Sequence, residues 1–259
     1  MKKSGFQFKK FFIAHDRCAM KVNTDGILLG AMAEINNAKQ ILDLGTGTGL
    51  IAIILAQRTA ENCYITALEL EPNAYQQAVE NAQHSAWKRR ITVQQGDIFE
   101  ADFPKKFDLI VSNPPYFRNS LASRTPERDL ARSLQKSHFD WLMQAKKWLA
   151  QTGKISFILP TQEAGKLLEQ SKKSGLFCTK IYQIITKNGQ SPKRLILTFQ
   201  FEHLDCKIKP LVGYVNQEFT HRNYLTCVRG MLFHTPYRLN RTFNLNHFEY
   251  LDLVTNFNI

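Results

Sequence analysis

The residues best suited to chemistry are Asn113, Pro114, Pro115 and Tyr116, which follow the apolar run Phe107–Ser112. Two consecutive prolines fix φ and remove two backbone N–H groups, so the carbonyl of Pro114 can be held facing a pocket. The Asn113 side-chain oxygen is a second acceptor, and the ring of Tyr116 offers a flat face for stacking. Two acceptors would stabilise the positive charge that develops when a planar, poorly nucleophilic nitrogen attacks. The motif therefore predicts catalysis at an adenine amine or a glutamine amide with no general base required, the structural alternative being a rigid turn.

Three glycines alternate with other residues in the motif DLGTGTG, which runs from Asp43 to Gly49. Glycines in such a turn let a ligand lie against backbone that a Cβ would block. A dinucleotide site has the spacing GxGxxG, whereas the spacing here is GxGxG and Leu50 stands in place of the last glycine. The Asp43 carboxylate would repel a phosphate and attract an ammonium or sulfonium group. The motif favours a cationic ligand without a pyrophosphate, although such a turn can also serve packing alone.

Acidic residues stand at the ends of three successive predicted strands: Asp43, Glu69 and Asp97. A carboxylate one βα unit after the glycine loop can accept both hydroxyls of a ribose, and Glu69 has that position. Asp97 can accept the exocyclic amine of an adenine. Together the three acids predict a pocket for a ligand with an adenosine and a positive centre, which is S-adenosylmethionine. For Glu69, the alternative is a solvated carboxylate at a helix start.

The elements that must position these residues alternate between strand and helix patterns, which predicts parallel pairing in a doubly wound sheet whose ligands bind at the carboxyl ends of the strands. Helices are expected in between, including a long one over Leu130–Ala150. The predicted strands are 40–44, 63–70, 91–95, 107–112, 154–160, 177–186 and 193–201.

Composition limits the class of protein. With 44% apolar residues in a chain of 259, a folded core is expected and global disorder is excluded. No apolar run approaches the roughly 20 residues of a membrane helix, and Lys9 and Lys10 lie where a signal peptide would be apolar, so we expect a cytoplasmic protein with no membrane partner. Five cysteines without ligand spacing predict reduced thiols and no metal site.

The net charge of +12 is unevenly distributed. Residues 41–117 hold six basic and nine acidic residues, whereas residues 118–259 hold twenty-one basic and ten acidic ones. Basic ends around an acidic middle would suit a protein that binds a small cationic ligand and grips a polyanion. Charge alone leaves open the alternative that the basic residues only solvate helix faces.

These motifs resemble the class I S-adenosylmethionine-dependent methyltransferases that modify amino groups. The stretch FKKFFIAHDRCAMKVNTDGILLGA, residues 8–31, resembles the bacterial tRNA (adenine-N6) methyltransferases that modify adenine 37 of valine tRNA, beside the anticodon. The resemblance covers residues 5–201. It implies a Rossmann-like α/β fold with a seven-stranded, mostly parallel sheet whose last strand is antiparallel.

The same resemblance implies the site residues. Catalysis is expected at Asn113, Pro114, Pro115 and Tyr116. Cofactor contacts are expected at Lys21, Thr24, Asp25, Asp43, Gly45, Gly47, Gly49, Glu69, Asp97 and Asn113. From the sequence alone, Lys21 and Asp25 could also be an ordinary helix-start pair.

Two segments depart from the family pattern or lie beside the motif. Phe117 stands where relatives often have a second tyrosine. The tail after residue 220 mixes arginines with aromatic residues, which suits contacts with a nucleic-acid backbone and stacking on its bases. The same tail could also be a packed helix or a disordered end. We expect three parts: a capping segment at 1–36, the methyltransferase domain at 37–203 and a basic, aromatic extension at 204–259. Four arginines after the motif could meet phosphate or form a solvated face: Arg118, Arg124, Arg128 and Arg132.

The resulting hypothesis is a monomeric enzyme that binds the tRNA anticodon arm and transfers a methyl group to the N6 amine of an adenine. A protein glutamine N5-methyltransferase would use the same motif on an amide. A non-catalytic RNA-binding protein on a methyltransferase fold is a third hypothesis. The basic charge and the N-terminal stretch favour the first, and intact cofactor and catalytic motifs disfavour the last.

Overall fold

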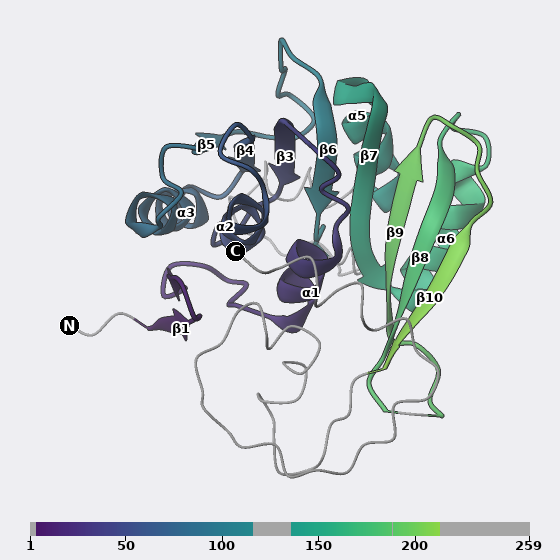
Figure 1. Ribbon diagram of the computed structural model, residues 1–259, viewed down its shortest axis with the longest axis horizontal. Coiled ribbons are helices and arrows are strands. Elements are labelled where there is room, and N and C mark those ends of the chain that lie inside the picture. The colour runs from purple at the N-terminus through teal and green to yellow at the C-terminus, as the bar shows by residue number, and fades with distance from the viewer. Residues whose placement is uncertain (1–3, 116–135, 188, 213–259) are drawn as a thin grey trace, which may run out of the picture.

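The computed structural model describes residues 4–115, 136–187 and 189–212. Its main sheet is built, in chain order, from β3 (Gln40–Leu44), β4 (Tyr64–Glu69), β5 (Ile91–Gln95), β6 (Phe107–Ser112), β7 (Leu149–Pro160), β8 (Phe177–Ile185), β9 (Arg194–Gln200) and β10 (Lys207–Val212). The strands lie side by side in the order β10-β8-β9-β7-β6-β3-β4-β5 (Figure 1). All neighbours are parallel except β9, which is antiparallel to β7 and β8. The predicted doubly wound, mostly parallel sheet with its antiparallel strand is confirmed.

The strand order reverses between β3 and β6. From β3 the chain adds β4 and β5 on one side, then crosses over to add β6 and β7 on the other. Connections leave such a switch point in opposite directions, which opens a crevice at the carboxyl ends of the two strands. The DLGTGTG loop follows β3 and the NPPY motif follows β6, so the topology brings both motifs to this crevice.

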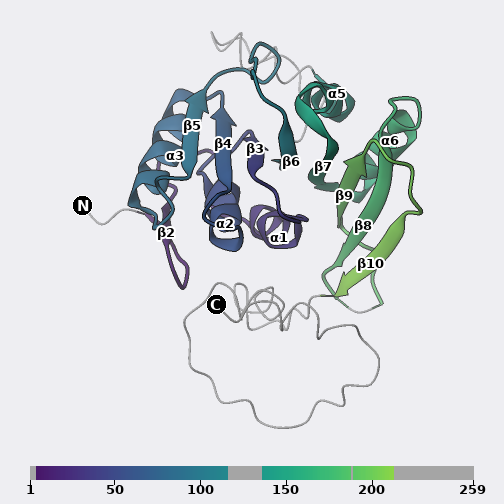
Figure 2. The ribbon, with the colours of Figure 1, turned by 45° about the horizontal axis from the view of Figure 1, so that its top comes forward.

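Helices cover both faces of the sheet (Figure 2). On one face lie α1 (Thr24–Met32), α2 (Leu50–Arg58) and α3 (Pro72–His84), and on the other lie α5 (His138–Trp148) and α6 (Thr161–Ser171). Each helix layer packs on its own buried apolar cluster. Within the part of the chain that the structure describes, no helix is long and apolar enough to cross a membrane.

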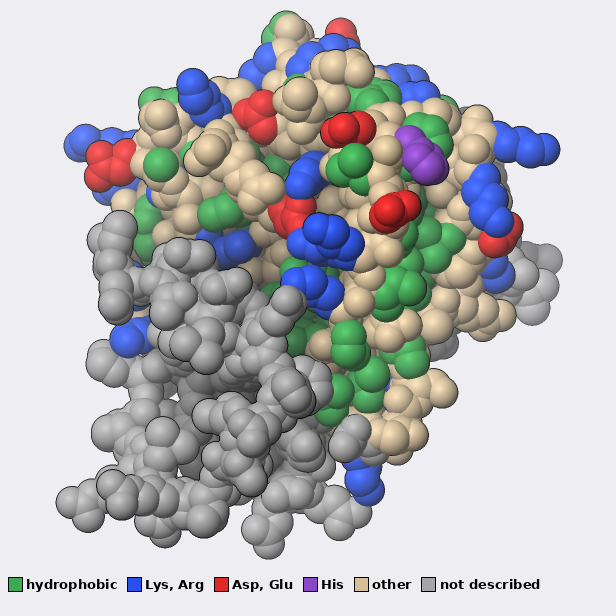
Figure 3. Space-filling view, turned by 45° about the vertical axis from the view of Figure 1, so that its right-hand side comes forward, with side chains coloured by type: hydrophobic (Ala, Val, Ile, Leu, Met, Phe, Trp, Pro, Cys, Tyr) green, Lys and Arg blue, Asp and Glu red, His purple; other side chains and the backbone are tan. Residues whose placement is uncertain are grey.

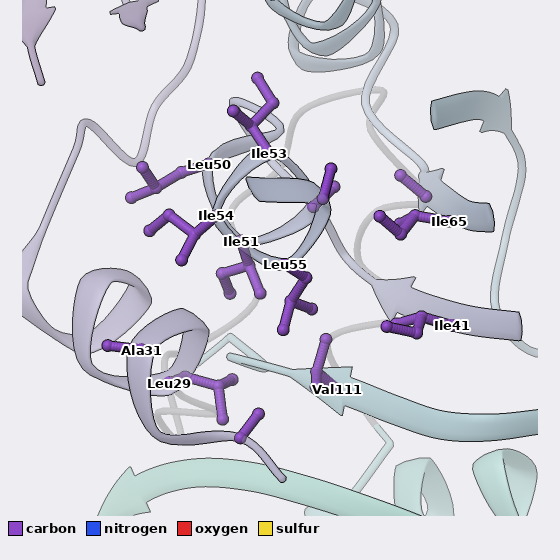
Figure 4. Packing of buried hydrophobic residues seen from close by; sticks show 14 of the residues in the cluster. Leu29, Ala31, Ile41, Leu50, Ile51, Ile53, Ile54, Leu55, Ile65 and Val111 are labelled. Atoms are coloured by element: carbon purple, nitrogen blue, oxygen red, sulfur yellow. The ribbon is translucent and has the colours of Figure 1, made fainter. Parts of the chain in front are cut away.

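The alternation of side chains along β3 explains how both clusters form. Ile41 packs with Leu55 of α2 and Val111 of β6 on one face (Figure 4), whereas Leu42 and Leu44 pack in the cluster under α5. All four β3 residues from Ile41 to Leu44 are fully buried, so the strand is apolar apart from Asp43. Burial of apolar side chains on two faces is typical of a central strand in a parallel sheet.

A small hairpin of β1 (Gly5–Gln7) and β2 (Phe12–Ala14) packs against α3. The amide of Asn81 makes two hydrogen bonds with the Ala14 backbone, at 3.0 and 2.8 Å, and donates a third to the Thr48 carbonyl at 2.8 Å. Asn81 is buried, so this network is shielded from water. The amide therefore ties the N-terminal hairpin to the glycine loop.

Two elements differ from the sequence-based expectation. The sheet has an eighth strand, β10, inside the segment expected to be an extension; it pairs in parallel with β8 at the edge of the sheet. Its residues from Lys207 to Pro210 are exposed, so the strand lacks the apolar pattern that reveals buried strands. The expected helix at 130–150 is described from His138 and ends at Trp148, because Leu149 already pairs with Phe107 of β6. Residues 130–135 lie outside the described residues.

Candidate active site

The glycine loop adopts a backbone that requires glycine. Gly45, Gly47 and Gly49 have φ of +69°, +57° and +79°, in the left-handed region that other residues rarely adopt. A Cβ added at Gly47 would meet no described residue within 4 Å, so none of the described side chains covers this part of the loop. A Cβ at Gly45 would lie 3.2 Å from Cη2 of Trp141. The loop thus presents bare backbone on the ligand side while α5 packs against its base.

Substitution of glycine by alanine tests this reading of the loop. We expect Gly45→Ala to lower the free energy of unfolding by about 1–2 kcal/mol, because alanine is strained at positive φ and its Cβ would crowd Trp141. Gly165 in α6 is the matched control, since a Cβ there meets none of the residues that the structure describes within 4 Å, and alanine favours a helix by about 0.5–1 kcal/mol. Urea unfolding of both variants measures the two effects. Equal changes in the free energy of unfolding for the two variants would contradict the backbone strain expected for alanine at position 45.

Asp43 is fully buried at the carboxyl end of β3. Its Oδ2 accepts a hydrogen bond from Thr46 Oγ1 at 2.5 Å, whereas Oδ1 has no hydrogen-bond partner among the described residues. Burial raises the pKa of Asp43 to about 7, and the nearby Glu69 adds to the rise, while the hydrogen bond from Thr46 opposes it. A buried, unpaired carboxylate oxygen is costly unless a donor or cation reaches it. The site is therefore suited to a positively charged ligand group.

Glu69 at the end of β4 supports the glycine loop directly. Its Oε2 accepts the backbone N–H of Gly47 at 2.7 Å, and its Oε1 accepts that of Glu71 at 3.0 Å. Burial raises the pKa of Glu69 in spite of these hydrogen bonds. The carboxylate keeps lone pairs beyond the two that these bonds use, so it can still accept from a ribose. The alternative of a solvated helix-start carboxylate fits Glu71 instead, which caps α3 through Asn73 and Ala74.

The three predicted acids do meet along one edge of the sheet. Leu44 is in register with Leu68, and Glu69 with Gln95, so the ends of β3, β4 and β5 are adjacent. Asp97 follows β5 by two residues, and its Oδ1 accepts the N–H of Phe99 at 2.8 Å.

The NPPY motif begins directly after β6, beside the glycine loop. Ser112 is in register with Leu44, and its hydroxyl donates to the Leu44 carbonyl at 2.7 Å. Next along the chain, Asn113 donates from Nδ2 to Sδ of Met20 at 3.7 Å, whereas its buried Oδ1 has no partner among the described residues. Among the described residues, the side chain thus holds an unused acceptor just after β6, beside the glycine loop. Tyr116, Phe117 and the four arginines lie outside the described residues, as does the tail after 212.

The N-terminal segment holds the remaining predicted cofactor residues, Lys21, Thr24 and Asp25. Asn23 caps α1, accepting the N–H of Gly26 at 2.8 Å, so Lys21 is not the cap. Lys21 is exposed. Asp25 forms an ion pair with Arg194, whose Nε lies 2.9 Å from Oδ2.

Sequence reasoning missed four residues at the site: Met20, His138, Trp141 and Arg194. Trp141 is buried against Gly45, and its Nε1 has no partner among the described residues. Arg194 begins the antiparallel strand β9 and so lies at the same edge as the ends of the parallel strands. Only that antiparallel direction could have pointed to Arg194 in the sequence; no sequence signal marks the other three.

Comparison with known proteins identifies the family. A family model described as methyltransferase small domain matches residues 21–171. The tRNA1(Val) (adenine(37)-N6)-methyltransferase of Actinobacillus pleuropneumoniae serotype 7 is 66% identical over 213 residues, 82% of this chain and 90% of that protein. The protein of the same name from Haemophilus influenzae strain 86-028NP is 53% identical over 198 residues, 76% of this chain and 84% of its own length. The chain belongs to the tRNA1(Val) (adenine(37)-N6)-methyltransferase family.

Solved structures support the fold of this methyltransferase. An S-adenosylmethionine-dependent O-methyltransferase from Thermotoga maritima superposes with a TM-score of 0.54 at 13% identity, covering 72% of this chain and 68% of that one. TrmN from Thermus thermophilus gives a TM-score of 0.51 at 20% identity, covering 68% of this chain and 47% of that one. Family membership confirms the predictions of an enzyme, of methyl transfer and of S-adenosylmethionine as cofactor.

The described residues of the methyltransferase fit that cofactor. Oδ1 of Asp43, which has no partner among the described residues, supplies a buried negative acceptor for a cationic ligand, and none of these residues fills the space at Gly47 where a ligand could lie against the loop. Glu69 and Asp97 add carboxylates at the next two strand ends. The individual contacts stay predictions.

Proposed function

We propose that this methyltransferase transfers the methyl group of S-adenosylmethionine to the N6 amine of adenine 37 in the anticodon loop of valine tRNA. The observation that carries the proposal is the unused, buried oxygen of Asn113 beside the glycine loop. The names of the relatives support tRNA and the N6 position. The resemblance of residues 8–31 to that family supports the same substrate.

In this mechanism the cofactor supplies an electrophilic methyl group, and the protein positions the amine. Asn113 Oδ1 and the Pro114 carbonyl oxygen would accept hydrogen bonds from the two N–H groups of the amine. This arrangement favours a tetrahedral nitrogen whose lone pair is free to attack the methyl group. Positioning two reactants in line can lower the activation free energy by on the order of 7 kcal/mol, which is more than a single hydrogen bond contributes. The amine proton leaves after transfer, so no side chain has to act as a base beforehand. Tyr116 stacks on the adenine, which is worth about 1–3 kcal/mol.

The target base has to leave the loop to reach this crevice. Unpaired bases cost least to extract, which suits an anticodon loop. Lys and Arg residues on the half of the sheet beyond β6 would hold the tRNA backbone, since residues 136–212 include thirteen of them against five Asp and Glu. On the face that Figure 3 shows, Lys and Arg side chains lie among those of Asp and Glu. Contacts between basic side chains and tRNA phosphates would therefore be spread over this surface. We propose a monomer acting in the cytoplasm, with 1–36 capping the catalytic domain 37–203.

Incubation with tRNA and the cofactor, followed by mass spectrometry of the nucleosides, tests the substrate. We expect N6-methyladenosine from valine tRNA made in vitro and none from the same tRNA with guanosine at position 37. A release factor, tested in parallel, should gain no methyl group. Methylglutamine in the release factor would support the glutamine hypothesis, and an absence of both products with normal cofactor binding would support a non-catalytic RNA-binding protein.

Salt dependence tests the electrostatic part of the proposal. Phosphate contacts release counterions, so raising KCl from about 50 to 200 mM should weaken tRNA binding by at least about tenfold. Filter binding at several salt concentrations measures this, with cofactor affinity as the control that should change little. A tRNA affinity independent of salt would contradict the role of the basic residues.

A further inference from the structure

A buried histidine links the catalytic motif to two helices on one face of the sheet. His138 lies in the first turn of α5 and is 5% exposed. Its Nε2 is 3.2 Å from the carbonyl oxygen of Pro115, and its Nδ1 is 3.7 Å from Oε2 of Glu163 in the first turn of α6. The ring therefore lies between the NPPY motif and α6.

The chemistry of the two neighbours determines where the ring carries its proton. A carbonyl only accepts hydrogen bonds, so the contact with Pro115 requires Nε2–H. Burial lowers the pKa of His138, and Lys166 lowers it further, while Glu163 and the Pro115 carbonyl raise it. The Glu163 carboxylate also forms an ion pair with Lys166, whose Nζ lies 2.8 Å from Oε1, so its negative charge is partly neutralised. At neutral pH the neutral ring donates from Nε2 to Pro115.

This hydrogen bond constrains the neighbouring carbonyl as well. The peptide planes that carry the Pro114 and Pro115 carbonyls are joined at the α-carbon of Pro115, and the proline ring fixes φ there. Only ψ of Pro115 remains soft between the two planes. Because His138 occupies the Pro115 carbonyl, that oxygen cannot turn to the crevice as a competing acceptor.

The helix that carries His138 is itself firmly placed. Ser137 and Asp140 form a capping box that closes the first turn of α5, and Asp140 Oδ2 accepts from the Ser137 backbone at 2.8 Å. One turn later, Trp141 packs on Gly45 of the glycine loop. One rigid helix thus contacts the catalytic motif through His138 and the cofactor loop through Trp141.

We infer that His138 is a positioning residue for methyl transfer, which orients the Pro114 carbonyl through its hydrogen bond to Pro115. The inference rests on the proposed function, because it assumes that the Pro114 carbonyl accepts the substrate amine. It predicts an effect on kcat with little effect on cofactor or tRNA binding.

The test compares two replacements of similar size. His138→Leu removes the donor, and we expect kcat for tRNA methylation to fall at least about tenfold, since small displacements at a reacting centre are costly. His138→Gln keeps a side-chain N–H at the place of Nε2, and kcat should return to within about threefold of wild type. Cofactor affinity by calorimetry and KM for tRNA should stay within about twofold in both variants. Lys166→Ala, which leaves the histidine in place, is the control with near wild-type kcat.

Equal kcat for the leucine and glutamine variants, at either a high or a low value, would overturn the inference. So would a loss that appears in cofactor affinity instead of kcat. If the leucine variant does not fold by thermal melting, His138→Asn replaces it, since asparagine is too short to reach Pro115 and should lose kcat where glutamine keeps it. Wild-type turnover of tRNA in the same assay separates this result from a failure of the proposed function.

Discussion

Replacement of Asn113 by alanine should lower kcat about 10²- to 10³-fold, the loss typical when one preorganised hydrogen-bonding group is removed from a developing charge. The side chain offers a buried oxygen with no partner among the described residues, and it lies next to the glycine loop without supporting it. Cofactor affinity should therefore stay within about threefold of wild type. Single-turnover methylation of tRNA and calorimetry with S-adenosylmethionine measure the two quantities.

The matched control is Asn36→Ala. Asn36 is exposed and precedes β3, so it lies at the opposite, amino end of the strands. Both variants lose one amide, but only Asn113→Ala should lose turnover. Activity near wild type in Asn113→Ala would show that the amine is not held by this side chain.

Replacement of Asp43 by asparagine should weaken cofactor binding at pH 8 by more than about tenfold, because the buried charge that faces the cation is removed. The free protein has the pKa of Asp43 raised to about 7, so the carboxylate is protonated below that pH. Wild-type affinity should therefore fall as pH drops through about 7, and binding near pH 6 should take place with release of a proton. The asparagine variant should lose this pH dependence.

The same substitution makes a prediction about stability. The pKa of Asp43 is raised from 3.8 to about 7 on folding, so the folded protein holds a proton that the unfolded chain releases. The free energy of unfolding of the wild type should then decline as pH rises from about 4 to 7, because the folded protein has to ionise a buried carboxyl group. Without cofactor, Asp43→Asn should melt above wild type at pH 8, with the difference shrinking toward pH 5.

Calorimetry in buffers of different ionisation heat measures the released proton, and scanning calorimetry measures the melting temperatures. The control is Asp102→Asn, which removes an exposed carboxylate before β6 and should change neither property. Cofactor affinity that is flat between pH 5.5 and 8 would contradict the assigned titration of Asp43.

The fold and the glycine loop of the candidate site could be predicted because local sequence determines them. Glycines at Gly45, Gly47 and Gly49 mark positive φ directly, and apolar runs reveal strands that are buried on both faces. Asp43 and Asn113 follow from their places at the ends of such strands. The sheet order then brings them to one crevice.

Other features depend on contacts between distant segments. The Arg194 to Asp25 ion pair joins residues far apart in the chain, and the place of His138 between Pro115 and Glu163 depends on how three elements meet. β10 was missed because edge strands can be polar and exposed. None of these leaves a periodic pattern in the sequence.

A crystal structure with bound S-adenosylmethionine would show whether the methyl group faces the two oxygens proposed to hold the substrate amine. We expect the methyl carbon to point toward Asn113 Oδ1 and the Pro114 carbonyl, with room between them for an adenine amine about 3 to 3.5 Å from the methyl group. A methyl carbon directed away from these two oxygens, with the rest of the cofactor bound at Asp43 and Glu69, would contradict this expectation.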